Sequence, residues 1–215
     1  MILAIDGPAG TGKSTVAKKA AERLGITYLD TGAMYRAVTL YFLENNIDIG
    51  KDVEEALNKI EIRFDKEKTL LQGEDVTEQI RSNEVNQKVS AVSAIPQVRA
   101  KMSAIQRAIG KSSSLVAEGR DMGTVVFPNA DCKIFLSASA DVRAKRRYEE
   151  EVQKGKNPNY EKIKASILQR DEMDSNRAIA PLKKAEDAVE IDTSLMGIDE
   201  VVDAIMKSIE DKHAV

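Results

Sequence analysis

The sequence predicts an α/β fold: a five-stranded parallel sheet covered by helices on both faces. Three observations carry this prediction: short continuous apolar runs typical of buried strands, helix-like stretches after them, and turn signals at the junctions. Strands that alternate with helices favour a parallel sheet. At 215 residues, the chain is long enough for one compact body with a small subdomain.

The first element is an apolar run at residues 2–5, Ile-Leu-Ala-Ile, which ends at Asp6-Gly7 and suits a strand buried on both faces. Residues 13–24 place their apolar side chains at spacings of three and four, which predicts a helix, and Gly25 stands where a helix C-cap belongs. The chain therefore begins as strand, glycine loop and helix.

Later runs repeat this scheme. Four of them are interpreted as further strands of the same sheet: Thr27–Leu29, Leu115–Ala117, Lys133–Leu136 and Ala188–Ile191.

The stretch 60–76 breaks the rhythm, because apolar residues surround a charged turn at 65–68, and this pattern predicts a small antiparallel hairpin. We expect an insert at about 60–80, then helices at 84–94 and 96–109, and a loop at 155–159.

The composition indicates which partners and which cellular location to expect. With 32 basic and 35 acidic residues, the net charge is -3, so we expect neither nucleic acid nor a membrane as partner. Cys132 is the single cysteine, which excludes an intrachain disulfide and favours a small buried residue. The amino terminus has no basic leader, and no apolar run approaches the roughly 20 residues that span a bilayer. We expect a cytoplasmic monomer.

The strongest motif is Gly7-Pro8-Ala9-Gly10-Thr11-Gly12-Lys13-Ser14, which matches G-x-x-x-x-G-K-[ST] between a predicted strand and a predicted helix. Glycines let successive backbone N–H groups converge on a polyphosphate at the positive end of a helix. Lys13 would reach the β and γ oxygens of ATP, and Ser14 would help to hold Mg²⁺. The alternative is a glycine-rich turn that binds nothing. A guanine-reading motif is absent, since Asn58-Lys59-Ile60-Glu61 has the wrong acidic residue and continues a helical pattern.

Two arginine-bearing clusters follow predicted strands, where a parallel sheet exposes its functional loops. In the first, Thr31 and Arg36 either meet a substrate phosphate or form a capped helix with an exposed arginine. In the second, Arg120 and Asp121 form a local ion pair or present an arginine to phosphate and a carboxylate to an amine or hydroxyl. Glu118 would organise the waters of the metal or orient an arginine.

A third cluster lies between residues 143 and 177. Arg143, Arg146 and Arg147 share one helix face by spacing, and Arg170, Asp174 and Arg177 follow at i, i+4 and i+7. A solvated, salt-bridged helix is one explanation of such spacing. Phosphoryl transfer is the other, because it depends on positioned positive charge and on a lid that excludes water.

With these motifs, the sequence resembles those of the bacterial cytidylate kinases, a group of P-loop nucleoside monophosphate kinases. The resemblance covers essentially the whole chain, 1–215, and its specific parts are Ile5-Asp6-Gly7-Pro8-Ala9-Gly10, Leu29-Asp30-Thr31-Gly32-Ala33-Met34-Tyr35-Arg36, Gly73-Glu74-Asp75-Val76, Glu118-Gly119-Arg120-Asp121-Met122-Gly123-Thr124-Val125-Val126-Phe127-Pro128 and Asn176-Arg177-Ala178-Ile179-Ala180-Pro181-Leu182.

The resemblance implies transfer of the γ-phosphoryl group of ATP, with Mg²⁺, to CMP or dCMP in pyrimidine nucleotide metabolism. It implies a core at about 1–59, 81–147 and 178–215, a nucleotide-binding insert at about 60–80 and a lid at about 148–170. The ATP side would consist of Gly7, Pro8, Ala9, Gly10, Thr11, Gly12, Lys13, Ser14, Thr15, Arg146 and Arg147. The acceptor side would consist of Thr31, Tyr35, Arg36, Arg99, Arg120, Asp121, Arg170, Asp174 and Arg177. Catalysis would fall to Lys13, Arg120, Arg170 and Arg177.

Two departures from the family pattern stand out: Thr31 replaces a common Ser, and Glu118 replaces a common Asp. The first keeps the hydroxyl, whereas the second leaves the role of Glu118 open. The alternatives are a kinase with UMP, AMP or a non-nucleotide acid as acceptor, and a nucleotide-dependent switch without phosphoryl transfer.

Overall fold

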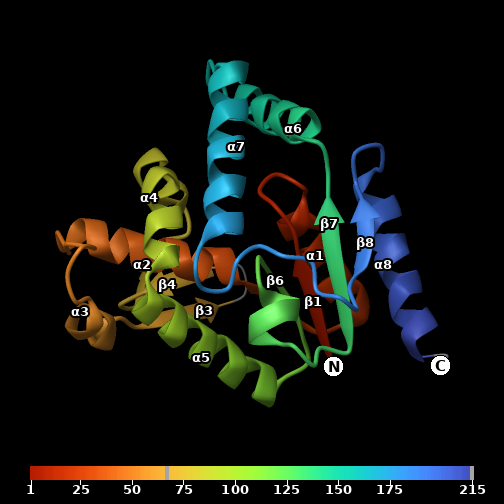
Figure 1. Ribbon diagram of the computed structural model, residues 1–215, viewed down its shortest axis with the longest axis horizontal. Helices are drawn as coiled ribbons and strands as arrows, with labels where there is room; N and C mark the ends of the chain where they lie inside the picture. The colour runs from red at the N-terminus through yellow and green to blue at the C-terminus, as the bar shows by residue number, and fades with distance from the viewer. Residues whose placement is uncertain (66–67, 214–215) are drawn as a thin grey trace. The chain divides into compact units, whose positions relative to one another are not determined.

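The structure, a computed structural model, describes residues 1–65 and 68–213 (Figure 1). The chain forms two compact units: unit 1 consists of Met1–Leu29 and Gly110–Val215, and unit 2 consists of Asp30–Ile109. The predicted insert at 60–80 falls within unit 2, and the predicted lid at 148–170 falls within unit 1. The extents of core, insert and lid stay predictions.

Unit 1 is built on the predicted parallel sheet, whose strand order is β2-β6-β1-β7-β8. The strands are β1 (Ile2–Asp6), β2 (Thr27–Asp30), β6 (Leu115–Gly119), β7 (Cys132–Ser137) and β8 (Val189–Asp192). All five predicted strands are confirmed, with ends that differ by one or two residues. The central strand β1 pairs Leu3 with Val116 on one side and with Cys132 on the other.

Unit 1 also contains four long helices, α1 (Lys13–Leu24), α6 (Ala140–Gln153), α7 (Tyr160–Asn176) and α8 (Ile198–His213), of which α1 and α8 pack on the sheet. Helix α1 ends at Leu24, and Gly25, with a φ of 66°, forms the left-handed C-cap that its sequence position predicted. Helix α6 follows β7, and α7 packs beside it as a helical hairpin (Figure 1). A π-helical turn, η2 (Met122–Val126), follows β6 and was not anticipated from the sequence.

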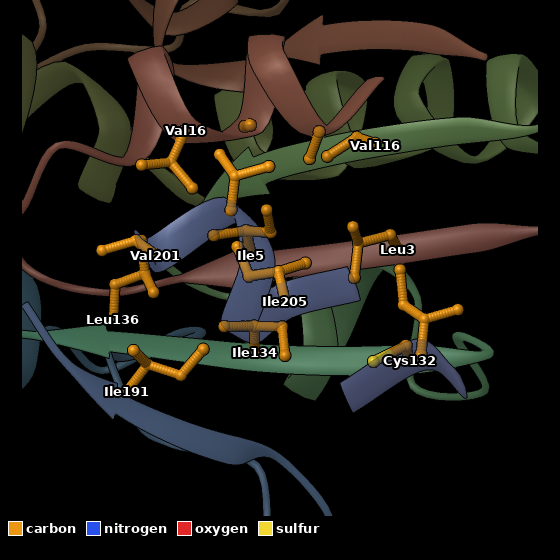
Figure 2. Close-up of a cluster of buried hydrophobic side chains, with 14 of the residues drawn as sticks. Leu3, Ile5, Val16, Val116, Cys132, Ile134, Leu136, Ile191, Val201 and Ile205 are labelled. Carbon is orange, nitrogen blue, oxygen red and sulfur yellow. The ribbon is translucent and has the colours of Figure 1, made fainter. Parts of the chain in front are cut away.

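The main core of unit 1 lies between the sheet and helices α1 and α8 (Figure 2). Leu3 and Ile5 of β1 point into it together with Ile134 of β7, and Val16 and Ile205 cover them from the two helices (Figure 2). Each fully buried side chain of this size contributes roughly 1.5–3 kcal/mol. Because side chains alternate along a strand, Asp6 points to the opposite face, where it meets η2.

Unit 2 is mainly helical. It contains α2 (Thr31–Glu44), α3 (Glu54–Lys59), α4 (Asn83–Ala94) and most of α5 (Pro96–Ser112), with a short 3₁₀ turn, η1 (Gln79–Arg81). Asp30 caps α2, because its side chain accepts from the backbone N–H of Ala33 at 2.9 Å. The two helices predicted at 84–94 and 96–109 are confirmed as α4 and α5.

The predicted hairpin is present in unit 2 as part of a three-stranded antiparallel sheet of β3 (Ile62–Asp65), β4 (Lys68–Leu71) and β5 (Glu74–Asp75). Ile62 lies opposite Leu71, and Leu70 lies opposite Asp75. Residues 66 and 67, the centre of the predicted charged turn, lie outside the described residues.

One spacing argument was wrong. Arg177 does not continue the face of Arg170 and Asp174, because α7 ends at Asn176 and Arg177 is extended, with φ −64° and ψ 141°. Within residues 1–65 and 68–213, no helix combines the length and the apolar character that a membrane span requires.

Candidate active site

The phosphate loop, Gly7–Gly12, joins the carboxyl end of β1 to the first residue of α1. Gly10 and Gly12 have φ angles of 82° and 86°, a left-handed region that favours glycine. Gly7 lies against β7, where an added Cβ would approach the carbonyl oxygen of Leu136 to 2.2 Å. The tight curl of the loop therefore depends on its glycines, as the motif predicted.

Lys13, the first residue of α1, is 5% exposed, and its Nζ donates to the carbonyl oxygen of Pro8 at 2.6 Å. Burial, and then the charges of Arg120 and Arg170, lower the pKa of this ammonium from 10.5 to about 7, whereas Glu118 acts in the opposite direction. Three cationic groups therefore lie close enough to repel one another in this part of unit 1.

Arg170 on α7 belongs to the same cluster. Burial, and then the charge of Arg120, lower its pKa from 12.5 to about 10. Its Nε is buried and has no hydrogen-bond partner among the described residues; the nearest carboxylate oxygen, Oδ2 of Asp174, is 3.9 Å away. A half-buried guanidinium whose buried Nε has no acceptor can bind an anionic ligand.

Asp174 interacts with three surrounding arginines, Arg120, Arg170 and Arg177. Its Oδ2 accepts from Nε of Arg120 at 2.9 Å, and the carboxylate is 4% exposed. Burial acts to raise its pKa, but the charges of Arg120, Arg170 and Arg177 hold the pKa below its ordinary value. This carboxylate therefore stays ionised and orients Arg120.

Arg177 and Asp121 form a second ion pair in unit 1, with Nη2 and Oδ1 3.5 Å apart. Nε of Arg177 also donates to the carbonyl oxygen of Ala180 at 2.6 Å, and Ala180 adopts a left-handed φ of 51°. Asp121 is 1% exposed. The structure thus brings Arg120, Asp121, Asp174 and Arg177 together, although α7 itself ends before Arg177.

Asp6 anchors the turn that carries Arg120 and Asp121. Its two carboxylate oxygens accept from the backbone N–H groups of Met122 at 2.8 Å and Gly123 at 2.7 Å. Burial raises the pKa of Asp6 to about 6, although both backbone donors act to lower it. The residue just before the phosphate loop is thereby bonded to the start of η2.

Glu118, whose role the sequence left open, is 4% exposed and accepts from the hydroxyl of Tyr28 at 2.6 Å. It lies at the carboxyl end of β6, opposite Ile5 of β1. Its charge favours the protonated form of Lys13.

The two arginines predicted on the ATP side differ in their surroundings. Arg146 donates from Nη1 to the hydroxyl of Thr193 at 3.1 Å, and that hydroxyl lies 3.3 Å from the carbonyl oxygen of Thr11 in the phosphate loop. Arg147 is instead half-buried on α6, where it pairs with two glutamates of the same helix and its charge also acts to lower the pKa of Arg170. Arg146 is thus linked to the loop, and Arg147 is not.

In unit 2, the predicted acceptor residues gather around α2. Arg36 donates from Nη1 to the carbonyl oxygen of Ile80 at 3.0 Å and to Oδ1 of Asn86 at 2.6 Å. These bonds tie α2 to η1 and α4.

The remaining three residues of this group are buried. Thr31 is 2% exposed, and the guanidinium of Arg99 lies 5.3 Å from the ring centroid of Tyr35, within cation–π range. Arg99 also donates to the carbonyl oxygen of Ser93 at 3.1 Å. Unit 2 therefore contains its own buried, positively charged polar cluster.

The sequence did not identify every residue around the loop. Arg143 was noted only as part of an arginine cluster, yet its Nη1 donates to the backbone carbonyl oxygen of Ala9 at 3.0 Å. Asp171 and Thr193 carried no signal of their own beyond the neighbouring Arg170 and the end of a strand. Asp6 had one signal, its place directly before Gly7.

Ser14 is the residue that the sequence predicts as a magnesium ligand. Among the described residues, no group of three or more His, Cys, Asp and Glu side chains could hold a metal ion. Mg²⁺ commonly binds nucleotide phosphates with only one or two protein ligands. Ser14, exposed in the first turn of α1, fits such a ligand, and Thr15 beside it is also exposed.

Comparison of the whole chain with known proteins shows its family. Residues 3–211 match the family model described as "Cytidylate kinase". A cytidylate kinase of Shouchella clausii is 49% identical, over 97% of this chain and 96% of that protein. One of Carboxydothermus hydrogenoformans is 48% identical, over 100% of both chains.

A crystal structure of an uncharacterized protein from Eubacterium ventriosum has a TM-score of 0.54 and 19% identity, over 98% of each chain. It supports the fold alone. The family match and the full-length relatives together show that this chain belongs to the cytidylate kinase family.

Proposed function

We propose that four cationic side chains stabilise the phosphoryl group in transfer: Lys13, Arg120, Arg170 and Arg177. As a cytidylate kinase, the protein transfers the γ-phosphoryl group of ATP to CMP or dCMP. The observation that carries the proposed roles is the mutual repulsion of Lys13, Arg120 and Arg170, with the buried Nε of Arg170 unsatisfied. Like charges gathered in a buried site are unfavourable unless the site is built for a polyanion.

Charge stabilisation suits this chemistry. In phosphoryl transfer, negative charge spreads over the equatorial oxygens of the group in flight, and the acceptor phosphate is already an anion. No general base is therefore needed. Prepositioned guanidinium and ammonium groups stabilise the developing charge, and one such arginine contributes on the order of 10³-fold or more. Asp174, which is held ionised, keeps Arg120 in place for this task.

On the ATP side, we assign the phosphates to the backbone of the loop from Gly7 to Gly12, with Lys13, Ser14, Thr15, Arg146 and Arg147 completing the set. Support comes from the positive φ angles of the loop glycines and from the link between Arg146 and the loop through Thr193. Mg²⁺, when bound with ATP, neutralises phosphate charge, and Ser14 is the residue proposed to hold it.

On the acceptor side, we assign Thr31, Tyr35, Arg36 and Arg99 in unit 2, and Arg120, Asp121, Arg170, Asp174 and Arg177 in unit 1. The supporting features are the buried Arg99–Tyr35 contact in the first group and the buried ion pairs in the second. In such pairs the arginine can bind a phosphate, and the carboxylate can accept hydrogen bonds from an amine or hydroxyl of the nucleotide. A lid at about 148–170, a monomeric state and a cytoplasmic location stay predictions.

A coupled assay of ADP release with MgATP tests this function, with CMP, dCMP, UMP and AMP as separate acceptors. Release that depends on CMP or dCMP is expected. Release that no acceptor changes would favour a nucleotide switch, and preference for AMP or UMP would exclude a cytidine acceptor.

The residue roles are tested with Arg120→Ala. This change is expected to lower kcat/KM for CMP by roughly 10²-fold or more, since it removes a transition-state arginine, while ATP affinity stays within about threefold. Equal loss of ATP binding would show that Arg120 serves the other nucleotide.

A further inference from the structure

The backbone of Ala9, inside the phosphate loop, is held from both sides by one ion pair. Its carbonyl oxygen accepts from Nη1 of Arg143 at 3.0 Å, and its N–H donates to Oδ1 of Asp171 at 3.4 Å. The two side chains also bond to each other, with Nη1 of Arg143 2.6 Å from Oδ2 of Asp171. Ala9 and the ion pair therefore form a closed ring of contacts.

Arg143 is rigidly placed for this contact. Its side chain is only 7% exposed, and its Nε donates to the carbonyl oxygen of Ala138, just before α6, at 3.0 Å. Its Cβ lies so near Gly10 that a Cβ added there would stand 3.1 Å away. The loop thus packs directly against the stem of Arg143, and the fork of its guanidinium bonds to the backbone.

Arg143 and Asp171 belong to the two helices of the α6–α7 hairpin. Arg143 lies in the first turn of α6, and Asp171 lies on α7 directly after Arg170. Arg170 in turn lies close enough to Lys13 to lower the pKa of its ammonium. The contact at Ala9 therefore joins the start of the loop that ends in Lys13 to the helix that carries Arg170.

We propose that Arg143 and Asp171 form a positioning pair, which aligns the phosphate loop with α7 so that Lys13 and Arg170 act on the same phosphoryl group. Neither residue touches a nucleotide in this role; both act through the backbone of Ala9 and through the placement of α7. The inference rests on the roles proposed for Lys13 and Arg170.

The alignment must be accurate because phosphoryl transfer depends on geometry: a misplacement of about 1 Å can cost on the order of 10²-fold in rate. An arginine suits the role better than a lysine, since Nη1 bonds to Ala9 and Asp171 while Nε of the same planar group donates to Ala138 and fixes its orientation.

The chain offers a matched control in a second ion pair between the same helices. Asp141 on α6 lies 2.6 Å from Nζ of Lys164 on α7, and it also accepts from the hydroxyl of Tyr160 at 3.1 Å. This pair joins α6 to α7 as the first pair does, but among the described residues neither Asp141 nor Lys164 bonds to the phosphate loop. A change at Asp141 therefore weakens the contact between α6 and α7 without removing a bond to the phosphate loop.

The test compares steady-state kinetics and thermal melting for Arg143→Met, Asp171→Leu, the double variant and Asp141→Asn. For Arg143→Met we expect kcat to fall about 10²-fold, with the KM values of ATP and CMP within about threefold of the parent, because alignment rather than binding is lost. The double variant should lose no more than about threefold beyond the worse single variant, since the two residues act as one unit. Asp141→Asn should keep kcat within about twofold.

Four results would overturn the inference: a folded Arg143→Met enzyme with parental kcat, a rise in the KM of ATP without a change in kcat, multiplied losses in the double variant, or an equal loss in Asp141→Asn. If Arg143→Met does not fold, Arg143→Lys serves instead, with an expected loss of about 10-fold in kcat because one ammonium replaces the fork.

Arg170→Ala separates this inference from the proposed function. An Arg170→Ala enzyme with parental kcat would contradict the role of Arg170 itself. A defective Arg170→Ala enzyme beside an unaffected Arg143→Met enzyme would contradict only the positioning pair.

Discussion

Replacing Lys13 by methionine is expected to make the ligand-free protein more stable while it abolishes phosphoryl transfer. Burial and two neighbouring arginines lower the pKa of Lys13 from 10.5 to about 7. At about 1.4 kcal/mol per pKa unit, this difference corresponds to about 5 kcal/mol that disfavours the charged side chain in the folded state near neutral pH. The group is almost fully buried, so solvent screening does not reduce this figure much.

Part of the expected increase in unfolding free energy is offset by a lost hydrogen bond. The variant loses the hydrogen bond from Nζ to the carbonyl oxygen of Pro8, a charge-assisted bond worth about 2 kcal/mol, and leaves that oxygen to find another donor. Methionine fills a similar volume without a charge. We therefore expect the unfolding free energy to rise by about 1–3 kcal/mol, or the melting temperature by roughly 2–10 °C for a chain of this size.

The pH dependence gives the sharper test. The unfolded chain keeps the proton of Lys13 up to about pH 10, whereas the folded protein releases it near pH 7. The unfolding free energy of the parent therefore rises relative to the variant as pH increases above 7. The advantage of Lys13→Met should shrink by about 1 kcal/mol per pH unit.

Urea denaturation of both proteins between pH 6 and 9.5 measures this difference. Lys19→Met is the control, because Lys19 lies on the same helix, is exposed and forms a surface ion pair with Asp199. A variant no more stable than the parent, or a stability gap that does not change with pH, would refute the reasoning.

Three further outcomes are expected. Gly7→Ala should weaken ATP binding by more than about 10-fold in calorimetric titration, because a Cβ would stand 2.2 Å from the carbonyl oxygen of Leu136 and shift the loop; unchanged affinity would contradict the tight loop. Between pH 4 and 6, folded Asp6 keeps a proton that the unfolded chain has released. The unfolding free energy of the parent should therefore fall by about 3 kcal/mol relative to that of Asp6→Asn as pH rises through this range. A difference that stays constant with pH would contradict a pKa raised to about 6. Ile205→Ala should cost about 3 kcal/mol in denaturation with kcat unchanged, because it opens a cavity between α8 and the sheet; a kinetic loss at intact stability would be inconsistent with a core role.

The repeating parts of the fold were accessible from the sequence. Apolar runs such as residues 2–5 and 115–117 must be buried on both faces wherever they lie, so they predicted strands β1 and β6 without reference to any partner. The phosphate loop was equally readable, because the positive φ angles at Gly10 and Gly12 are a local demand that glycine meets.

Local spacing failed where the chain changed direction. The i, i+4, i+7 pattern treated Arg177 as part of a helix, yet α7 ends at Asn176. The extended backbone of Arg177 then brings its side chain to Asp121, 56 positions earlier in the chain. The π-helical turn after Asp121 was also not predicted from the sequence, because the carboxylate that anchors it, that of Asp6, lies on the distant strand β1.

By itself, the sequence determined the sheet, the phosphate loop and the family, because each of these depends on local patterning or on contiguous motifs. Only the tertiary structure decided the electrostatics of the site: the lowered pKa of Lys13, the raised pKa of Asp6, and the ion pair of Arg143 and Asp171 around Ala9. Burial and the distance between charges cause these effects, and both quantities exist only once distant segments of the chain have packed together.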